Sequence, residues 1–216
     1  MPELLLVRHA EAWHNLQSGV LTGREPIDSR LSSAGVQQAR WLGRYWAEQR
    51  MSPRPLHVSP TERTRKTAEY AMRVMGWKKP PARIVEVEEL HELHVGEWDG
   101  KLYDDIYTPE VREQMAKEDK HFVFPGGEST HQAARRLLGW AEETFAASPD
   151  DSPLLAVTHG IVAMCAKLEV TGWEETARAD RRVPGNTGIT SLTYDDGQWQ
   201  LQYYDRRPPA YIDEIG

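Results

Sequence analysis

Two histidines follow directly after the two clearest apolar runs of the chain. His9 comes after residues 4–7 and Arg8, and His159 comes after residues 153–158. Runs of this length are typical of strands buried on both faces of a sheet. Because the carboxyl ends of parallel strands share one edge, where ligand crevices form, we expect the two imidazoles to meet there. Either histidine alone could be a structural residue at a strand end, but the pair favours a functional site.

A third strand end carries an arginine. Residues 56–59 read as a short strand, and the segment Ser59-Pro60-Thr61-Glu62-Arg63 then begins a helix. Arg63 would lie where free backbone N–H groups and the helix dipole attract an anion. With Arg8 and the two histidines it forms a cluster of planar donors that suits a phosphoryl group. The alternative is that Arg63 only covers the helix.

Metal and disulfide chemistry are not expected. Cys165 is the only cysteine, so neither a disulfide nor a Cys-based zinc site can form within one chain. His91 and His94 are three residues apart, whereas the helical zinc motif needs histidines four apart. We therefore expect no metal and no cofactor.

Composition predicts one globular domain over residues 1–216. Hydrophobic residues make up 39% of the 216 residues and charged residues 27%, which is too apolar for a disordered chain. A net charge of −7 without long basic tracts argues against nucleic-acid binding. The N-terminal apolar stretch is too short for a signal peptide or a membrane span, so the expected location is the cytoplasm. A homodimer is one of the oligomeric states left open.

Strands alternate with helices along most of the chain. This order predicts an α/β fold with a mainly parallel central sheet. Helices are expected from Ser32 or Ser33 to before Pro53, and over residues 61–75, 128–147 and 160–171; strands are expected over 4–7, 56–59, 84–87 and 153–158, with a hairpin of 189–194 and 199–204. The polar section from Leu90 to Gly127, including the roles of residues 101–127, is not assigned.

Several motifs, in order and over nearly the whole chain, resemble those of the histidine phosphatase superfamily. The resemblance begins with the "RHG"-like Arg8-His9-Ala10-Glu11-Ala12 and Asn15. It continues with Thr22-Gly23-Arg24, SPTERTRKTAE, Leu90-His91-Glu92, Gly96-Glu97-Trp98-Asp99-Gly100, Pro125-Gly126-Gly127-Glu128-Ser129 and Val157-Thr158-His159-Gly160. It implies a three-layer α/β/α sandwich of the phosphoglycerate mutase-like type.

The resemblance also implies site roles. His9 would attack phosphorus and become a phosphohistidine, while Arg8, Arg63 and His159 hold the phosphoryl oxygens. Glu92 would be the general acid, with Glu11 as an alternative. Substrate contacts are expected from Asn15, Thr22, Gly23, Arg24 and Gly160, where Arg24 could reach a distal anionic group or pair with a surface acid; Lys101 is a weaker candidate for that contact.

The reaction expected is hydrolysis of a small phosphomonoester without a metal. Phosphoglycerate mutases in the family carry an Arg-Arg-Ser-type segment, an Asn after the second His-Gly and a Tyr at the position of Val95. This chain has no such segment after Glu92, and Ile161 stands in place of the Asn. A cofactor-dependent phosphoglycerate mutase and a catalytically weak phosphate-binding module remain the alternatives, and the physiological substrate is not specified.

Overall fold

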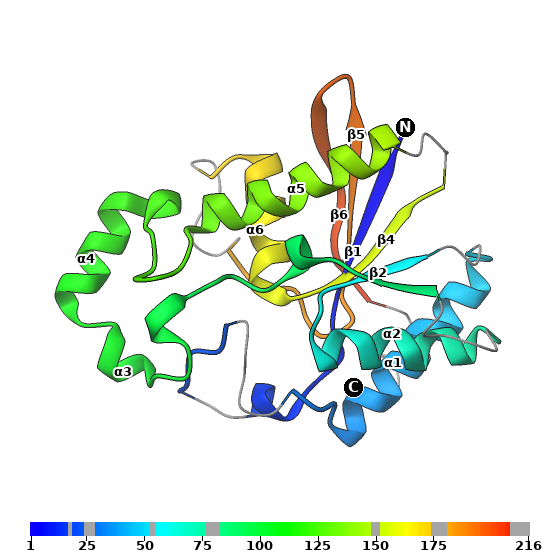
Figure 1. Ribbon diagram of the computed structural model, residues 1–216, viewed down its shortest axis with the longest axis horizontal. Coiled ribbons are helices and arrows are strands. Elements are labelled where there is room, and N and C mark those ends of the chain that lie inside the picture. The colour runs from blue at the N-terminus through cyan, green and yellow to red at the C-terminus, as the bar shows by residue number, and fades with distance from the viewer. Residues whose placement is uncertain are drawn as a thin grey trace.

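A single six-stranded sheet forms the centre of the computed structural model (Figure 1). The residues described are 1–16, 19–23, 29–51, 55–76, 83–147, 152–173 and 181–207. The strands are β1 (Glu3–Arg8), β2 (Leu56–Val58), β3 (Ile84–Glu86), β4 (Leu154–Thr158), β5 (Ile189–Asp195) and β6 (Gln198–Arg206). Their order across the sheet is β3-β2-β4-β1-β5-β6.

The first four strands in that order are parallel, and β5 and β6 run antiparallel at one edge. The pairing of β1 with β4 places Leu4 beside Leu154 and Arg8 beside Thr158. Both strands therefore end at the same level, and the His9 N–H donates to the Thr158 carbonyl at 2.9 Å. The two strand-end histidines are brought together by this register.

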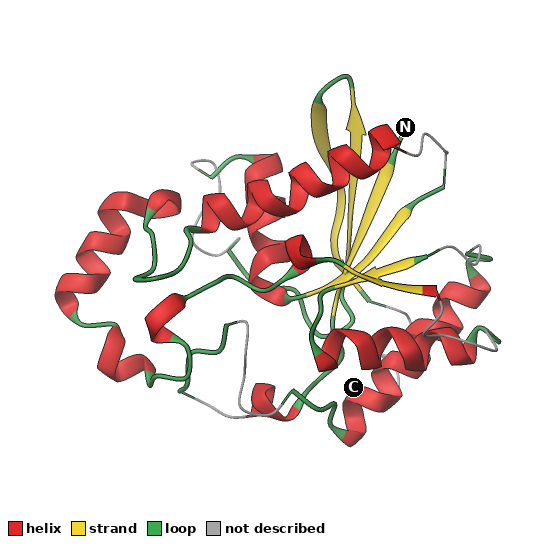
Figure 2. Cartoon of the chain, in the orientation of Figure 1, coloured by secondary structure: helices red, strands yellow, loops and turns green. Residues whose placement is uncertain are grey.

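Helices cover both faces of the sheet (Figure 2). Leu5 and Val7 face the helices α1 (Ser33–Glu48) and α2 (Glu62–Val74), whereas Leu4 and Leu6 point into the core beneath α5 (Thr130–Ala147). Helix α6 (Gly160–Thr171) packs with α5 on that second face. Because side chains alternate along β1, this strand contributes to a hydrophobic core on each face of the sheet. The predicted three-layer sandwich is confirmed.

Local signals set the ends of these elements. The Ser32 hydroxyl accepts the Gly35 N–H at 3.0 Å and caps α1, as expected for a serine before an apolar helical pattern. Gly76, with a φ of 82°, follows α2. In the β5–β6 hairpin, Asp196 and Gly197 have φ values of 46° and 77°, which is the conformation that tight hairpin turns require. Helix α5 begins at Thr130, two residues later than predicted.

The unassigned middle section is built from short helices. They are η3 (Glu88–Leu90), η4 (Gly96–Trp98), α3 (Tyr103–Ile106), α4 (Pro109–Glu118) and η5 (Asp119–His121). Another short helix, η1 (Trp13–Leu16), lies between β1 and α1. Helices α3 and α4 lie at one side of the molecule, beyond the sheet (Figure 1). Trp98 packs against Phe122 and Phe124 with ring centroids 5.8 and 5.3 Å apart, so aromatic contacts hold this segment in place. Over the described ranges, no helix combines the length and apolar character needed to cross a membrane.

Candidate active site

A cavity of about 300 Å³ lies at the carboxyl end of β1, next to the first residues of α2 and α6, residues 20–22 and the start of α3. Seven residues predicted from sequence line it: Arg8, His9, Asn15, Thr22, Arg63, Glu92 and Gly160. The remaining lining residues are His14, Val20, Leu21, Tyr103, Ile161 and Val183. Strand ends and helix starts thus deliver the predicted charged groups to one place.

His9 is prepared as a neutral nucleophile. Its Nδ1 lies 2.8 Å from the Ala10 carbonyl oxygen, which can only accept, so Nδ1 carries the proton and Nε2 keeps its lone pair. The side chain is only 2% exposed. Burial, and then the positive charges of Arg63 and Arg8, hold the pKa of His9 well below its usual value. The imidazole is therefore unprotonated at neutral pH.

Arg8 approaches the cavity through a close contact with the start of α6. Its Nη1 donates to the Pro184 carbonyl at 2.7 Å, while its buried Nε has no protein partner. A Cβ at Gly160 would lie 3.1 Å from that Nε and 2.5 Å from a methyl group of Val183. Glycine at position 160 therefore leaves the space that the guanidinium occupies.

Arg63 is buried in the floor of the cavity, with 1% of its surface exposed. Its Nε donates to His159 Nδ1 at 3.1 Å and its Nη2 donates to the Gly23 carbonyl at 3.3 Å. Burial lowers the pKa of Arg63 to about 10, so the side chain remains charged at neutral pH. Because the first turn of α2 also holds this residue, the guanidinium is fixed in position and in direction.

His159 stands beside His9, with ring centroids 5.4 Å apart, but it does not line the cavity. Because Arg63 donates to Nδ1, the proton of the neutral ring lies on Nε2, which donates to Ser59 Oγ at 2.7 Å. Burial, followed by the charge of Arg63, holds the pKa of His159 well below its usual value. The resemblance implied a direct contact with the phosphoryl group; in this structure both ring nitrogens contact protein atoms, and Nδ1 is the one that orients Arg63.

Ser59 is therefore expected to act as a positioning residue. Replacing it with alanine leaves the buried His159 Nε2–H without an acceptor, which should lower the free energy of unfolding by about 1–3 kcal/mol. Displacement of Arg63 should also reduce kcat/KM about tenfold, since misplacing a catalytic group by an ångström costs up to about 10²-fold. The ¹⁵N chemical shifts of the His159 ring should show a loss of the pure Nε2–H tautomer.

The control for Ser59→Ala is Thr108→Ala, which removes the cap of α4. It should lower stability and leave both the tautomer of His159 and kcat/KM unchanged. Unchanged ring shifts in Ser59→Ala would refute this role.

Glu92 joins the cavity to the N-terminus of α6. Its Oε1 accepts the N–H groups of Leu93 and Val162, both at 2.9 Å, and its Oε2 accepts the Ile161 N–H at 3.1 Å. Oε2 accepts one backbone N–H, and its second lone pair can therefore exchange a proton with a bound ligand. Glu11, the alternative acid, instead accepts a bond from Ser32 Oγ at 2.5 Å and does not line the cavity.

The remaining predicted substrate contacts do not all lie in the cavity wall. Asn15 and Thr22 line the cavity. Gly23 does not line it: its carbonyl binds Arg63 and its N–H donates to Asp99 Oδ1 at 2.9 Å, so it acts on the site through its backbone. Arg24 lies outside the described residues. Lys101 is exposed and is not part of the cavity wall.

Two residues that the sequence did not single out belong to this region. His14 was assigned no role in the site, yet it is 5% exposed, lines the cavity and lies 5.7 Å from the His9 ring. Asn186 Nδ2 donates to the His9 carbonyl at 3.0 Å, and the neighbouring Thr187 N–H donates to the Arg8 carbonyl. The only sequence signal for these contacts was turn composition before the predicted strand at Ile189.

Thr187 adopts a φ of 57°, which is unusual for a β-branched residue. It lies in a turn that the Gly188 N–H closes on the Gly185 carbonyl. The side chain of Asp205 accepts the Gly185 N–H at 2.8 Å and anchors that turn to β6. Contacts from the far edge of the sheet thus hold the backbone of the nucleophile.

Among the residues that the structure describes, no three His, Cys, Asp or Glu side chains are grouped so that they could bind a metal ion. His91, one of the two histidines considered for such a role, lies 3.1 Å from Glu88 through its Nε2.

Comparison with known proteins agrees with this geometry. The model of the histidine phosphatase superfamily (branch 1) matches residues 4–206. Phosphoserine phosphatase 1 of Hydrogenobacter thermophilus is 29% identical over 66% of this chain, and the match spans 64% of that enzyme, slightly less than two thirds of its length. A 2,3-bisphosphoglycerate-dependent phosphoglycerate mutase of Azorhizobium caulinodans is 26% identical over 73% of this chain and 75% of its own length. A mycobacterial glucosyl-3-phosphoglycerate phosphatase shares the fold, with a TM-score of 0.74 at 23% identity over 94% of this chain and 98% of its own.

Proposed function

Because this chain belongs to the histidine phosphatase superfamily (branch 1), we propose that it hydrolyses a small phosphomonoester through a phosphohistidine on His9. The observation that carries the proposal is the state of His9. A buried, neutral imidazole has its Nδ1–H bound to a carbonyl and its Nε2 free to attack, and two arginines lie beside it. Such a nucleophile needs no metal to be active.

In the first step, Nε2 attacks phosphorus and the bond from phosphorus to the ester oxygen breaks. The two arginines stabilise the charge that spreads over the phosphoryl oxygens, and their fixed positions mean that little reorganisation is needed. Arg63 is held by His159 and Gly23, and Arg8 is held by Pro184. Asn15 lines the cavity, and its Nδ2, which lies 3.0 Å from His14 Nε2, is a further donor.

Glu92 completes the cycle as the general acid and base. Its Oε2 gives a proton to the departing alkoxide, and the resulting carboxylate takes a proton from the water that attacks the phosphohistidine. Inorganic phosphate then leaves and His9 is regenerated in its neutral form. The attachment of Glu92 to three backbone N–H groups keeps it in one orientation throughout.

Hydrolysis is favoured over the mutase reaction by Ile161. This residue lines the cavity, so an apolar side chain stands where the mutases of the family carry an asparagine. Val95, the second departure from the mutase pattern, is 1% exposed in the core and does not line the cavity, so its identity bears on packing rather than on substrate contact.

The proposal predicts that the purified protein hydrolyses p-nitrophenyl phosphate in excess EDTA at the same rate as without it. A metal-free nucleophile requires no divalent ion, so the release of p-nitrophenol should not change. Activity that EDTA abolishes and a divalent metal restores would contradict the mechanism. The mutase alternative is tested by following interconversion of 2- and 3-phosphoglycerate with a bisphosphoglycerate primer, and a rate well above hydrolysis would replace the proposal.

A further inference from the structure

The cavity has a charged floor and a mouth in which apolar and aromatic side chains outnumber the neutral polar ones. His9, Arg63 and Glu92 are 2%, 1% and 7% exposed, whereas Tyr103 and Val183 are 41% and 36% exposed. The phosphoryl group belongs at the floor with the arginines. The partly exposed residues that line the cavity are Arg8, Asn15, Val20, Thr22, Tyr103, Ile161 and Val183. The rest of the substrate must therefore pass between these side chains, of which Val20, Tyr103, Ile161 and Val183 are apolar or aromatic.

The outer wall is built by two paired segments. Val20 forms a bridge with Leu102, the Leu21 N–H donates to the Lys101 carbonyl, and the Tyr103 N–H donates to the Gly19 carbonyl. Backbone pairing thus fixes Tyr103 at the start of α3, with its ring at the mouth of the cavity. Aromatic rings held in this way provide a flat surface for an apolar or aromatic group.

Among the described residues of the cavity wall, positive charge lies only on two arginines. Of the described residues that line the cavity, only Arg8 and Arg63 are cationic, and both are needed for the phosphoryl group. Arg181, near Val183 in sequence, is paired with Asp119 at 2.7 Å, and neither residue lines the cavity.

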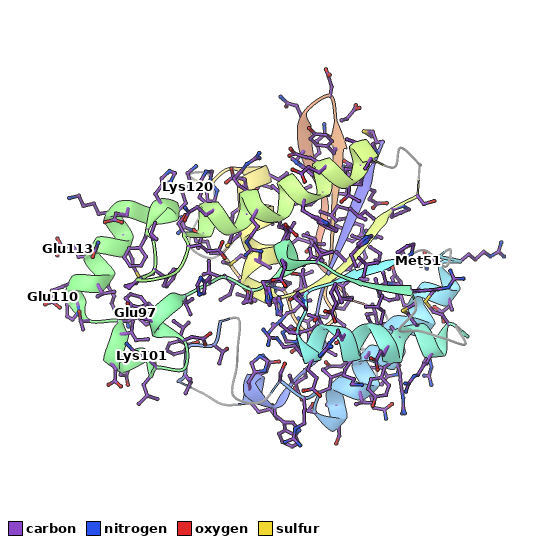
Figure 3. All side chains as sticks on the ribbon, in the orientation of Figure 1. Met51, Glu97, Lys101, Glu110, Glu113 and Lys120 are labelled. Carbon is purple, nitrogen blue, oxygen red and sulfur yellow. The ribbon has the colours of Figure 1, made fainter. Side chains whose placement is uncertain are left out.

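Two acidic residues follow Tyr103 directly in the sequence. Asp104 and Asp105 follow Tyr103 in the first turn of α3 and are exposed. Glu97, Glu110 and Glu113 lie around the α3–α4 segment, together with Lys101 and Lys120 (Figure 3). Asp104 and Asp105, the acids next to Tyr103, would repel a second anionic group on the substrate.

From these observations we infer that the substrate is a phosphomonoester of an uncharged alcohol that carries an apolar or aromatic group. The inference rests on the proposed phosphatase activity and adds the class of leaving group. A volume of about 300 Å³ limits that group to a small one, at the lower end of small-molecule sites.

A panel of phosphate esters whose leaving groups are all aliphatic alcohols tests the inference, because the rate of P–O bond cleavage differs little among such leaving groups. The kcat/KM for 2-phenylethyl phosphate should exceed those for phosphoserine and 3-phosphoglycerate about tenfold or more, since apolar contacts discriminate by about 10- to 200-fold per group. Tyr103→Ala should reduce the value for 2-phenylethyl phosphate about fivefold and should reduce that for phosphoserine by a clearly smaller factor. Leu102→Ala is the matched control, because Leu102 is 52% exposed beside Tyr103 and does not line the cavity.

Two further experiments distinguish a failure of this inference from a failure of the phosphatase proposal. Preference for phosphoserine or 3-phosphoglycerate, lost in Arg24→Ala, would overturn the inference and leave the phosphatase proposal standing. If no ester is hydrolysed, the phosphatase proposal fails, and binding of 2-phenylethylphosphonate against 3-phosphonopropionate by calorimetry still tests the mouth. Tighter binding of 2-phenylethylphosphonate would support the apolar class; equal or weaker binding would overturn it.

Discussion

His9→Ala should lower kcat for p-nitrophenyl phosphate by on the order of 10⁴- to 10⁶-fold, as expected when a covalent nucleophile is removed. Nε2 of His9 is the attacking atom, and a methyl group cannot replace it. The side chain is buried among polar groups, so the variant must be shown to fold by its circular dichroism spectrum and thermal unfolding.

Trapping the intermediate supplies a second readout for His9. Rapid quenching of the wild-type reaction in alkali should yield protein carrying a phosphoryl group bound through nitrogen, which is stable in alkali and labile in acid. His9→Ala should carry none. His121→Ala is the matched control, because His121 is exposed and lies outside the cavity; it should retain both activity and phosphorylation. Robust turnover by His9→Ala would disprove the nucleophile assignment.

Arg63→Gln should reduce kcat/KM by about 10²- to 10³-fold, since a fixed charge that stabilises the transition state is removed. It should also move the acid limb of the pH profile of kcat/KM to higher pH. His9 reacts as the neutral base, and after burial the charge of Arg63 is the largest cause that lowers its pKa. Removing that charge raises the pKa of His9, so protonation inactivates the nucleophile at a higher pH than in the wild type.

Two other variants separate charge from geometry. Arg63→Lys keeps the positive charge but loses the planar donors that reach His159 and Gly23, so kcat/KM should fall while the acid limb stays near its wild-type position. Arg65→Gln lies on the same helix and loses only an exposed pairing with Glu86, so neither quantity should change. Because the same substrate is used for every variant, its own ionisation contributes equally to all the pH profiles that are compared. An unshifted limb in Arg63→Gln would contradict the proposed electrostatic control of His9.

Much of the fold could be predicted because its signals are local. Residues 4–7 and 153–158 are apolar without interruption, and both become central strands of a sheet covered on two faces. Ser32 caps α1 where the sequence placed a helix start. The section after Leu90 could not be assigned, because its short helices are held by distant aromatic contacts and backbone pairs rather than by a periodic pattern.

The positions of two side chains near the site could not be predicted for the same reason. Val95, where the mutases of the family carry Tyr, packs in the core. His14 was assigned no role in the site, yet it lies against the nucleophile. Each of these side chains takes its direction from neighbours far along the chain, and spacing in the sequence carries no record of that direction.

The sequence by itself determined which side chains reach the carboxyl edge of the sheet, because a strand end followed by a helix start is a local pattern. That pattern predicted one site for His9, Arg63 and His159, whereas the family resemblance supplied Glu92. Only the tertiary structure decided their states: Ala10 and two arginines keep His9 neutral with Nε2 free, while Ser59, 100 positions from His159, selects the tautomer that orients Arg63. Protonation and hydrogen-bond direction depend on burial and on distant partners, and these exist only once the chain has folded.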